Sequence, residues 1–271
     1  CQRADVCPVG ALTTMDFRFE ARPWELTPVA SVCPHCPVGC NTTLSTRVEA
    51  RSGGRRVIKR IMPRQNEMVN EIWICDKGRF VHHYADAPDR LMRPLVRRNG
   101  ELTEASWDEA IDLVAGRLQQ NKGAVAGLAG GRLSNEDYFL FQRLLREGLE
   151  SNDLDLVDAR IGGAEAIARV GIAQGSNLQG LGPGDAILVV ASDLHQEGPV
   201  WWLRVKQATD RGATLVVLNA RPTRLDKHAR YAFHYGAGSA VHEARQLLNA
   251  AKIALNGEEQ EPLQAAAAEL V

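Results

Sequence analysis

Four cysteines in the first third of the chain have the spacing of ligands that share one metal centre. Cys33, Cys36 and Cys40 form a C-x2-C-x3-C pattern, and Cys75 follows 35 residues after Cys40. Thiolates at such short spacings converge only where a soft, positively charged group holds them together, and iron–sulfur clusters and zinc are the two candidates. No cysteine occurs after Cys75, which argues against a disulfide scaffold distributed through the chain.

The segment between the third and fourth of these cysteines predicts a β-hairpin. Thr42 to Ala50 alternates in polarity, Ser52-Gly53-Gly54 supplies a turn, and Arg55 to Met62 returns with apolar residues at Val57, Ile58 and Ile61. A chain that folds back in this way would bring Cys75 to the three earlier cysteines.

Cys7 lies in a different context, Cys-Pro-Val-Gly-Ala-Leu at residues 7–12. A cysteine followed by proline ends the bacterial ferredoxin run, and that cysteine ligates a cluster whose other ligands lie elsewhere in the chain. Cys7 is therefore predicted to be one ligand of a second cluster completed upstream of residue 1. The alternative is a free buried cysteine. Cys1 has no such context and is assigned no role.

Composition sets broad limits on the rest. The 271 residues are 45% hydrophobic and 24% charged with a formal net charge of −1, which is typical of a globular protein of one or two domains. Nothing in this balance points to nucleic acid or an anionic membrane, and no apolar run approaches the roughly 20 residues that span a bilayer. Because residue 1 is Cys rather than Met, we expect an internal segment of a longer protein.

From residue 102 onward, helix and strand signals alternate, which predicts an α/β fold with a mostly parallel, doubly wound sheet. The expected strands are 124–129, 154–157, 185–191 (the clearest buried strand) and 214–219, and the expected helices begin near Ser106, Ser134, Ala164, Pro199 and Asn256. No G-x-G-x-x-G pattern joins a strand to a helix, so a dinucleotide site is not predicted.

Four segments occur in the order found in one known family. They are Cys-Pro-Val-Gly-Ala-Leu-Thr (7–13), Ala-Arg-Pro-Trp-Glu (21–25), the cysteine motif at 33–40 and Trp-Ile-Cys-Asp-Lys-Gly-Arg-Phe (73–80). The chain resembles the large iron–sulfur (NuoG-type) subunit of NADH:quinone oxidoreductase, respiratory complex I, within the molybdopterin oxidoreductase superfamily. The resemblance implies three parts: the end of an upstream ferredoxin-like domain at 1–28, a 4Fe-4S domain at 29–85, and a partial molybdopterin-oxidoreductase-like α/β domain at 86–271.

The resemblance also implies roles for particular residues. One complete 4Fe-4S cluster would be bound by Cys33, Cys36, Cys40 and Cys75, with Lys77 adjacent to it, and a second, partial cluster by Cys7. No molybdopterin is expected, because the family's usual cysteine or selenocysteine ligand to molybdenum is missing from the α/β part. A Ser or Asp ligand to the metal is the alternative that this absence leaves open.

The function implied is electron transfer from NADH and flavin toward quinone, within a proton-translocating complex. The segment itself is expected to lack a catalytic site. Its partners would be the other subunits of the peripheral arm, with neither nucleic acid nor direct membrane insertion, at the cytoplasmic face of the bacterial inner membrane.

Two other functions remain open. One is the catalytic subunit of a molybdenum or tungsten oxidoreductase such as formate dehydrogenase, and the other is a structural zinc module without electron transfer. We expect His35 to flank the cluster rather than bind it, because four thiolates already complete a cubane. His82 and His83 are expected at the surface or at a subunit contact.

Overall fold

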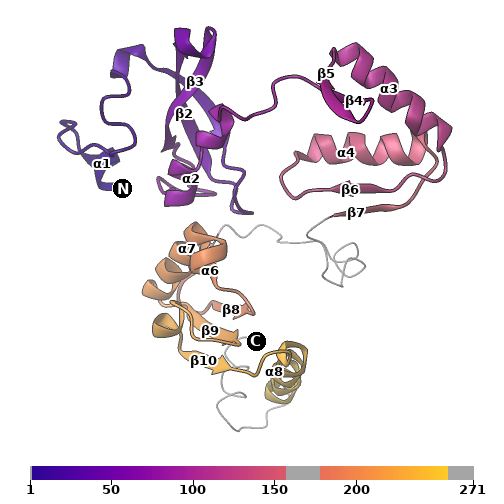
Figure 1. The fold of residues 1–271 in the computed structure, drawn as a ribbon. Helices are drawn as coiled ribbons and strands as arrows, with labels where there is room; N and C mark the ends of the chain where they lie inside the picture. Colours follow the sequence, from indigo (N-terminus) through magenta and orange to yellow (C-terminus); the bar gives the residue numbers. More distant parts are fainter. Residues whose placement is uncertain (1, 157–177, 256–271) are drawn as a thin grey trace. The chain divides into compact units, whose positions relative to one another are not determined.

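The computed structural model describes residues 2–156 and 178–255 (Figure 1). The chain divides into two compact units, one made of Cys1–His83 with Ala173–Val271 and the other of Tyr84–Ile172. Cys1, the helix expected near Ala164 and the helix expected from Asn256 lie outside the described residues.

A three-stranded antiparallel sheet dominates the amino-terminal part of the first unit. Its strands are β1 (Thr27–Val32), β2 (Asn41–Glu49) and β3 (Arg55–Pro63), in the order β1-β2-β3. The β2–β3 hairpin was predicted, and its turn contains Gly53 and Gly54, both at positive φ, where a side chain would be strained. Strand β1 was not predicted. The surrounding short elements are α1 (Gln2–Val6), η1 (Pro23–Glu25), η2 (Ala50–Ser52) and α2 (Asp76–Phe80), and η3 (His83–Asp86) begins at the last residue of this part of the unit.

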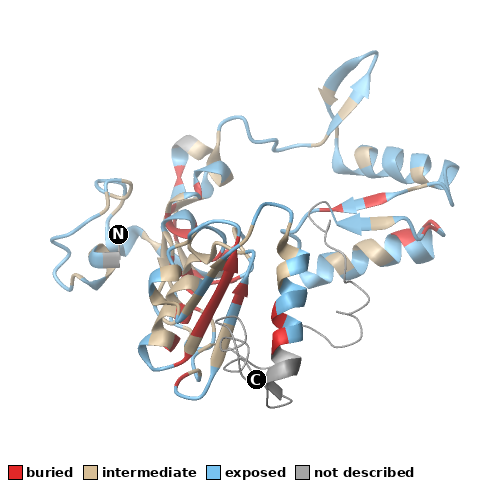
Figure 2. Cartoon of the chain, turned by 90° about the horizontal axis from the view of Figure 1, so that it is seen from below, coloured by how far each residue is buried: buried red, intermediate tan, exposed pale blue. Residues whose placement is uncertain are grey.

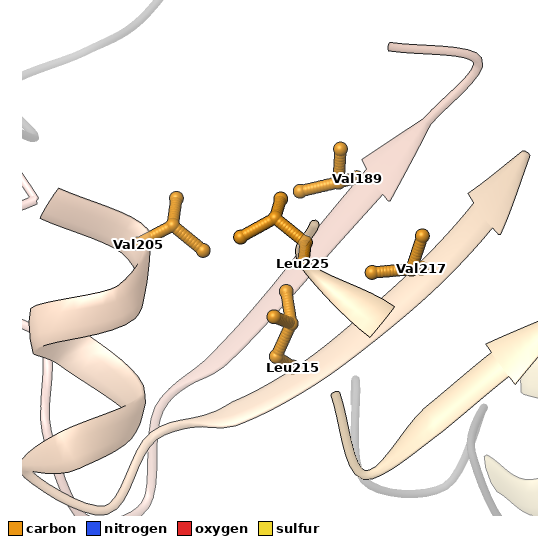
Figure 3. Close-up of a cluster of buried hydrophobic side chains, with 5 residues drawn as sticks. All are labelled: Val189, Val205, Leu215, Val217 and Leu225. Atoms are coloured by element: carbon orange, nitrogen blue, oxygen red, sulfur yellow. The ribbon is translucent and has the colours of Figure 1, made fainter. Parts of the chain in front are cut away.

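The carboxy-terminal part of the same unit contains a parallel sheet of order β10-β9-β8 together with the helices around it. Its elements are β8 (Ala186–Val190), α6 (Leu194–Glu197), α7 (Pro199–Asp210), β9 (Thr214–Asn219), η5 (Asp226–His228), β10 (Tyr231–His234) and α8 (Ala240–Leu255). Helix α7 begins at Pro199, as predicted from the proline's fixed φ. Figure 3 shows its core, in which Val205 of α7 packs with Val189 of β8, with Leu215 and Val217 of β9, and with Leu225 from the turn before η5.

The most buried strand is β9, not the strand expected at 185–191. Leu215 to Leu218 are almost completely buried, whereas Leu188 and Val190 of β8 keep more than a third of their surface exposed. The reason is position: β9 is hydrogen-bonded on both sides, while β8 is paired with β9 on one side. Figure 2 shows buried residues concentrated in this sheet.

In the residues that the structure describes, the second unit has two small sheets, two α-helices and a π-helical segment. Its elements are β4 (Leu95–Arg98), β5 (Glu101–Glu104), α3 (Trp107–Gln120), β6 (Gly127–Ala129), α4 (Asn135–Arg143), the π-helical η4 (Leu144–Gly148) and β7 (Leu154–Leu156). Strands β4 and β5 form an antiparallel hairpin, and β6 pairs with β7 in parallel. These α/β alternations and parallel pairs agree with the predicted fold class.

Helix α3 begins as predicted, with the Ser106 hydroxyl accepting a hydrogen bond from the Glu109 N–H at 3.1 Å. The sequence places Ile111 and Val114 on one apolar face of this helix, but that face is not buried, since both residues are more than half exposed. After α4, Leu145 is buried but Leu144 is not, because the chain widens into a π-helical turn at these residues and changes the face that each presents. Among the described residues, no helix has the length and apolar composition needed to cross a bilayer.

Candidate metal centre

The first three cysteines lie on a compact loop between β1 and β2. The Cys33 N–H donates to the Cys40 carbonyl at 2.9 Å, which closes the loop where the two strands begin to pair. Inside the loop, the Gly39 N–H donates to the Cys36 carbonyl at 3.3 Å, and Gly39 has a φ of 61°. Glycine adopts that left-handed conformation without strain, so it permits the sharp return to Cys40.

Cys75 follows the β2–β3 hairpin in the sequence, and the chain returns it to this loop. It is the N-cap of α2, and its sulfur accepts a hydrogen bond from the Gly78 N–H at 3.4 Å. Gly78 also lies against the first cysteine, because a Cβ atom placed on it would be 3.2 Å from the Cys33 sulfur. One glycine therefore touches both the early and the late thiol. The structure brings Cys75 to the trio, as the fold-back of the hairpin predicts.

The electrostatics of the four thiols is that of a shared site. Burial, together with negative charge on Cys33, Cys36 and Cys75, raises the pKa of the Cys40 thiol to about 12. Burial likewise raises the pKa of Cys33, with Cys75 and Cys36 adding to the effect. Four thiolates would repel one another here, so the ionised form of the site requires a positively charged group among the sulfurs.

Two residues near the thiols oppose this rise. The His35 backbone N–H donates to the Cys33 sulfur and the Lys77 ammonium lies close by, and both lower the pKa of Cys33. Lys77 is on the exposed side of α2. The structure thus places Lys77 beside the cysteines, where its charge favours the thiolate.

Helix α7 covers the cysteine loop, although it lies more than 120 residues further along the chain. Val200 packs with Cys33, Val38 and Cys40, in a cluster that Cys36, Val69 and Trp73 adjoin. One turn later, the guanidinium of Arg204 donates to the Glu71 carboxylate and to the Glu67 carbonyl. These contacts exclude water from the buried side of the site.

Asn70 holds the segment that precedes Cys75. Its side-chain oxygen accepts from the Asn41 N–H at 2.9 Å, and its amide donates to the Trp73 carbonyl at 3.0 Å. Asn70 is completely buried, and a buried amide is tolerated only when its hydrogen bonds are made. It therefore links the start of β2 to the chain that delivers the fourth cysteine.

Cys7 has the opposite surroundings. Backbone N–H groups of Leu12, Val9, Ala11 and Gly10 point at its sulfur and lower its pKa. Gly10 has a φ of 64°, which lets the loop curl around the thiol. The arrangement is a ring of amide donors around one thiolate, on a loop separate from the other four cysteines.

Sequence reasoning missed one group of potential metal ligands. Asp16, His82 and His83 each place a ligand atom within 4.8 Å of the others, and they form the one such group of three or more His, Cys, Asp or Glu residues in the part of the chain that is described. His83 is exposed as expected, but His82 is buried, because its ring lies under the end of α2 and contacts the Arg79 carbonyl. The adjacent histidines were the available signal, but Asp16 lies too far away in sequence to be associated with them.

Comparisons with known proteins agree with this geometry. Residues 28–83 match the NADH-ubiquinone oxidoreductase NDSU1/NuoG-like 4Fe-4S domain, and residues 90–246 match molybdopterin oxidoreductase. The chain is similar to the G 2 subunit of NADH-quinone oxidoreductase from Rhizobium meliloti, at 36% identity over 83% of this chain and 26% of the relative. It is also similar to the alpha subunit of F420-dependent formate dehydrogenase 1 from Methanococcus maripaludis, at 34% identity over 62% of this chain and 26% of that protein.

Among solved structures, acetylene hydratase from Pelobacter acetylenicus has the same fold. The superposition has a TM-score of 0.64 at 20% identity, and it covers 89% of this chain and 35% of the hydratase chain. The chain thus spans about a quarter of the curated relatives named above. Its two matched domains follow one another with little sequence between them, and the second covers more than half of the chain. The chain belongs to the molybdopterin oxidoreductase family and carries, ahead of that domain, a 4Fe-4S domain of the NADH-ubiquinone oxidoreductase NuoG-like type.

Proposed function

We propose that this chain is an electron-transfer part of the large iron–sulfur subunit of an NADH:quinone oxidoreductase. In this role Cys33, Cys36, Cys40 and Cys75 bind a 4Fe-4S cluster. The observation that carries the proposal is the convergence of these four thiols, from two distant segments, around one partly buried position. Bound there, such a cluster accepts and releases single electrons.

The protein's contribution is to hold the sulfurs and to set the polarity around them. Val200 excludes water on one side, while the Gly78 and His35 N–H groups donate to sulfur on the other. Hydrogen bonds to sulfur and nearby positive charge favour the more reduced, more negative state of a cluster, whereas burial disfavours that state. Lys77 adds a positive charge close to Cys33. These groups would tune the reduction potential.

The spacing of the thiols disfavours the structural zinc alternative. A single zinc ion with Zn–S bonds of about 2.3 Å holds its four sulfurs roughly 3.8 Å apart. In the described residues, no three of the four cysteine sulfurs lie within 4.8 Å of one another. The wider arrangement fits a group that has several metal atoms and presents one corner to each thiol.

Cys7 is proposed as one ligand of a second 4Fe-4S cluster whose remaining ligands lie outside this sequence. The support is its ring of four backbone N–H groups, which stabilises a thiolate in a partly buried position. The partners of the protein would be other subunits of the complex's peripheral arm. The place of action would then be the cytoplasmic face of the bacterial inner membrane.

A molybdenum or tungsten enzyme is the second candidate, and the formate dehydrogenase relative favours it. Two observations count against it. The NADH-quinone oxidoreductase relative aligns with 83% of this chain and the formate dehydrogenase with 62%. In addition, no cysteine follows Cys75 as a ligand to the metal. We therefore propose that this chain binds no molybdopterin.

The test is metal and sulfide analysis of the anaerobically purified protein, combined with visible and EPR spectra. The proposal expects brown protein with iron and acid-labile sulfide, and bleaching on reduction. Cys36→Ser should lose the cluster bound by the four thiols, whereas His35→Ala, which changes a neighbour that is not a ligand, should keep it. Protein that contains zinc but neither iron nor sulfide would refute the electron-transfer role, and stoichiometric molybdenum or tungsten would favour the second candidate.

A further inference from the structure

Asp16, His82 and His83 form a compact group on the side of α2 opposite its cysteine end. The Nε2 atom of His83 lies 2.8 Å from a carboxylate oxygen of Asp16. The two imidazole rings have centroids 4.3 Å apart and planes inclined by 31°. One ligand atom from each of the three residues lies within 4.8 Å of the other two. Two imidazoles and one carboxylate are a donor set typical of divalent transition metals.

The orientation of His82 is fixed by the backbone. Its Nδ1 atom lies 3.2 Å from the Arg79 carbonyl oxygen, and the side chain is only 3% exposed. A carbonyl accepts, so Nδ1 carries the proton and donates, and Nε2 carries the lone pair. Histidines that bind metals usually donate their other N–H to a carbonyl or carboxylate in this manner, which sets both the tautomer and the direction of the ring.

The surrounding charges permit a cation at this position. Arg79, whose backbone carbonyl contacts His82, is buried and its guanidinium is paired with the Asp5 carboxylate, so its charge is largely compensated. Asp16 contributes a negative charge that a bound divalent ion would share with His83. A cavity lined by Leu12, Met15 and Phe80 opens beside Asp16 and His83 and provides a route from solvent. Arg3 also lines this cavity, and it is exposed, so solvent screens its positive charge.

We propose that Asp16, His82 and His83 bind one divalent transition-metal ion, with zinc as the first candidate. Metal–nitrogen and metal–oxygen bonds of about 2.0–2.2 Å place neighbouring ligand atoms roughly 3.0–3.5 Å apart, close to the 2.8 Å already present between His83 and Asp16. The ion would join the loop after Cys7 to the end of the helix that Cys75 caps. It is separate from the cysteine ligands and would hold the two cysteine-bearing segments together.

The experiment uses the intact, cluster-loaded protein, purified anaerobically without a polyhistidine tag. The protein is incubated with Zn²⁺, desalted and analysed for zinc. Wild type should retain about one zinc ion per chain. His83→Ala and Asp16→Asn should each weaken retention by at least about tenfold. These two residues carry the test because truncating the buried His82 would leave a cavity. Co²⁺ in place of zinc should give visible d–d absorption that the same variants remove.

The matched control is His234→Ala. His234 also contacts a carboxylate, with its Nε2 atom 2.7 Å from Asp226, but the pair belongs to no group of three potential ligands among the described residues. Zinc retention should be unchanged in this variant. If wild type retains no more zinc than His83→Ala, or if Asp16→Asn retains as much as wild type, His83 and Asp16 form a simple ion pair and the metal site does not exist. Unchanged iron content and circular dichroism would verify that each variant is folded.

Discussion

Cys40 and Cys7 are chemically identical, but their surroundings shift their pKa values in opposite directions. Cys40 lies under Val200, and burial together with neighbouring thiols raises its pKa to about 12. Cys7 is only partly buried, and four backbone N–H groups lower its pKa. The buried site needs a bound cation before its thiols ionise, whereas the exposed loop stabilises a thiolate by itself. Tertiary packing therefore assembles the site around Cys40, whereas local backbone groups form the surroundings of Cys7.

The sharpest test of this contrast is thiol alkylation after the clusters have been removed. At pH 7.5 a thiol of pKa 12 is ionised about 10³-fold less than one below 9. The greater nucleophilicity of the more basic thiolate recovers a factor of roughly 10–30, so Cys7 should react with iodoacetamide at least about 30-fold faster than Cys40. Mass spectrometry of timed samples measures both rates.

The pH dependence of the alkylation rate tests the direction of each pKa shift. The Cys7 rate should level off below pH 9, the ordinary thiol pKa, while the Cys40 rate should still rise above it. Equal rates in protein whose circular dichroism is unchanged would contradict the assigned difference in environment.

The second prediction concerns the helix that buries Cys40. Arg204 is 2% exposed and donates to the Glu71 carboxylate, so Arg204→Ala would remove one partner of a largely buried pair. Breaking such a pair costs about 3–5 kcal/mol when both groups are buried. Glu71 keeps some hydration, so we expect roughly 2–3 kcal/mol, measured as a lower urea midpoint. Cys40 should become more reactive because α7 loosens, while Cys7 should not change.

The control for this variant is Arg143→Ala. Arg143 forms an exposed ion pair with Glu147 one helical turn away, and such pairs contribute little to stability. The urea midpoint should therefore stay at the wild-type value. A midpoint for Arg204→Ala equal to that of this control would mean that α7 does not hold the cysteine loop in place.

The same contrast separates what the sequence predicted from what it did not. The cysteine spacing and the glycines of the β2–β3 turn are local signals, and they predicted both the hairpin and the approach of Cys75. The cover provided by Val200 and Arg204 is not encoded near the cysteines, because contacts across more than 120 residues leave no periodicity in either segment. The exposure of Ile111 could not be predicted for the same reason. An apolar stripe indicates a helix, but it does not indicate whether another element covers that stripe.

The smallest predicted effect is at the glycine shared by Cys33 and Cys75. A Cβ on Gly78 would lie 3.0 Å from Ile74 and 3.2 Å from the Cys33 sulfur, so Gly78→Ala must displace one of them. Overpacking of this kind costs about 1–2 kcal/mol, and we expect a lower urea midpoint with a reduced iron content.

Gly116 in α3 is the matched control, because it is also helical but has nothing within 4 Å of its Cβ position. Gly116→Ala should leave the iron content unchanged and raise stability by about 0.5–1 kcal/mol, since alanine loses less backbone entropy in a helix. If Gly78→Ala behaved like Gly116→Ala, the helix capped by Cys75 would have room to move away from Cys33. The close approach of the two thiol-bearing segments would then not be a constraint on the site.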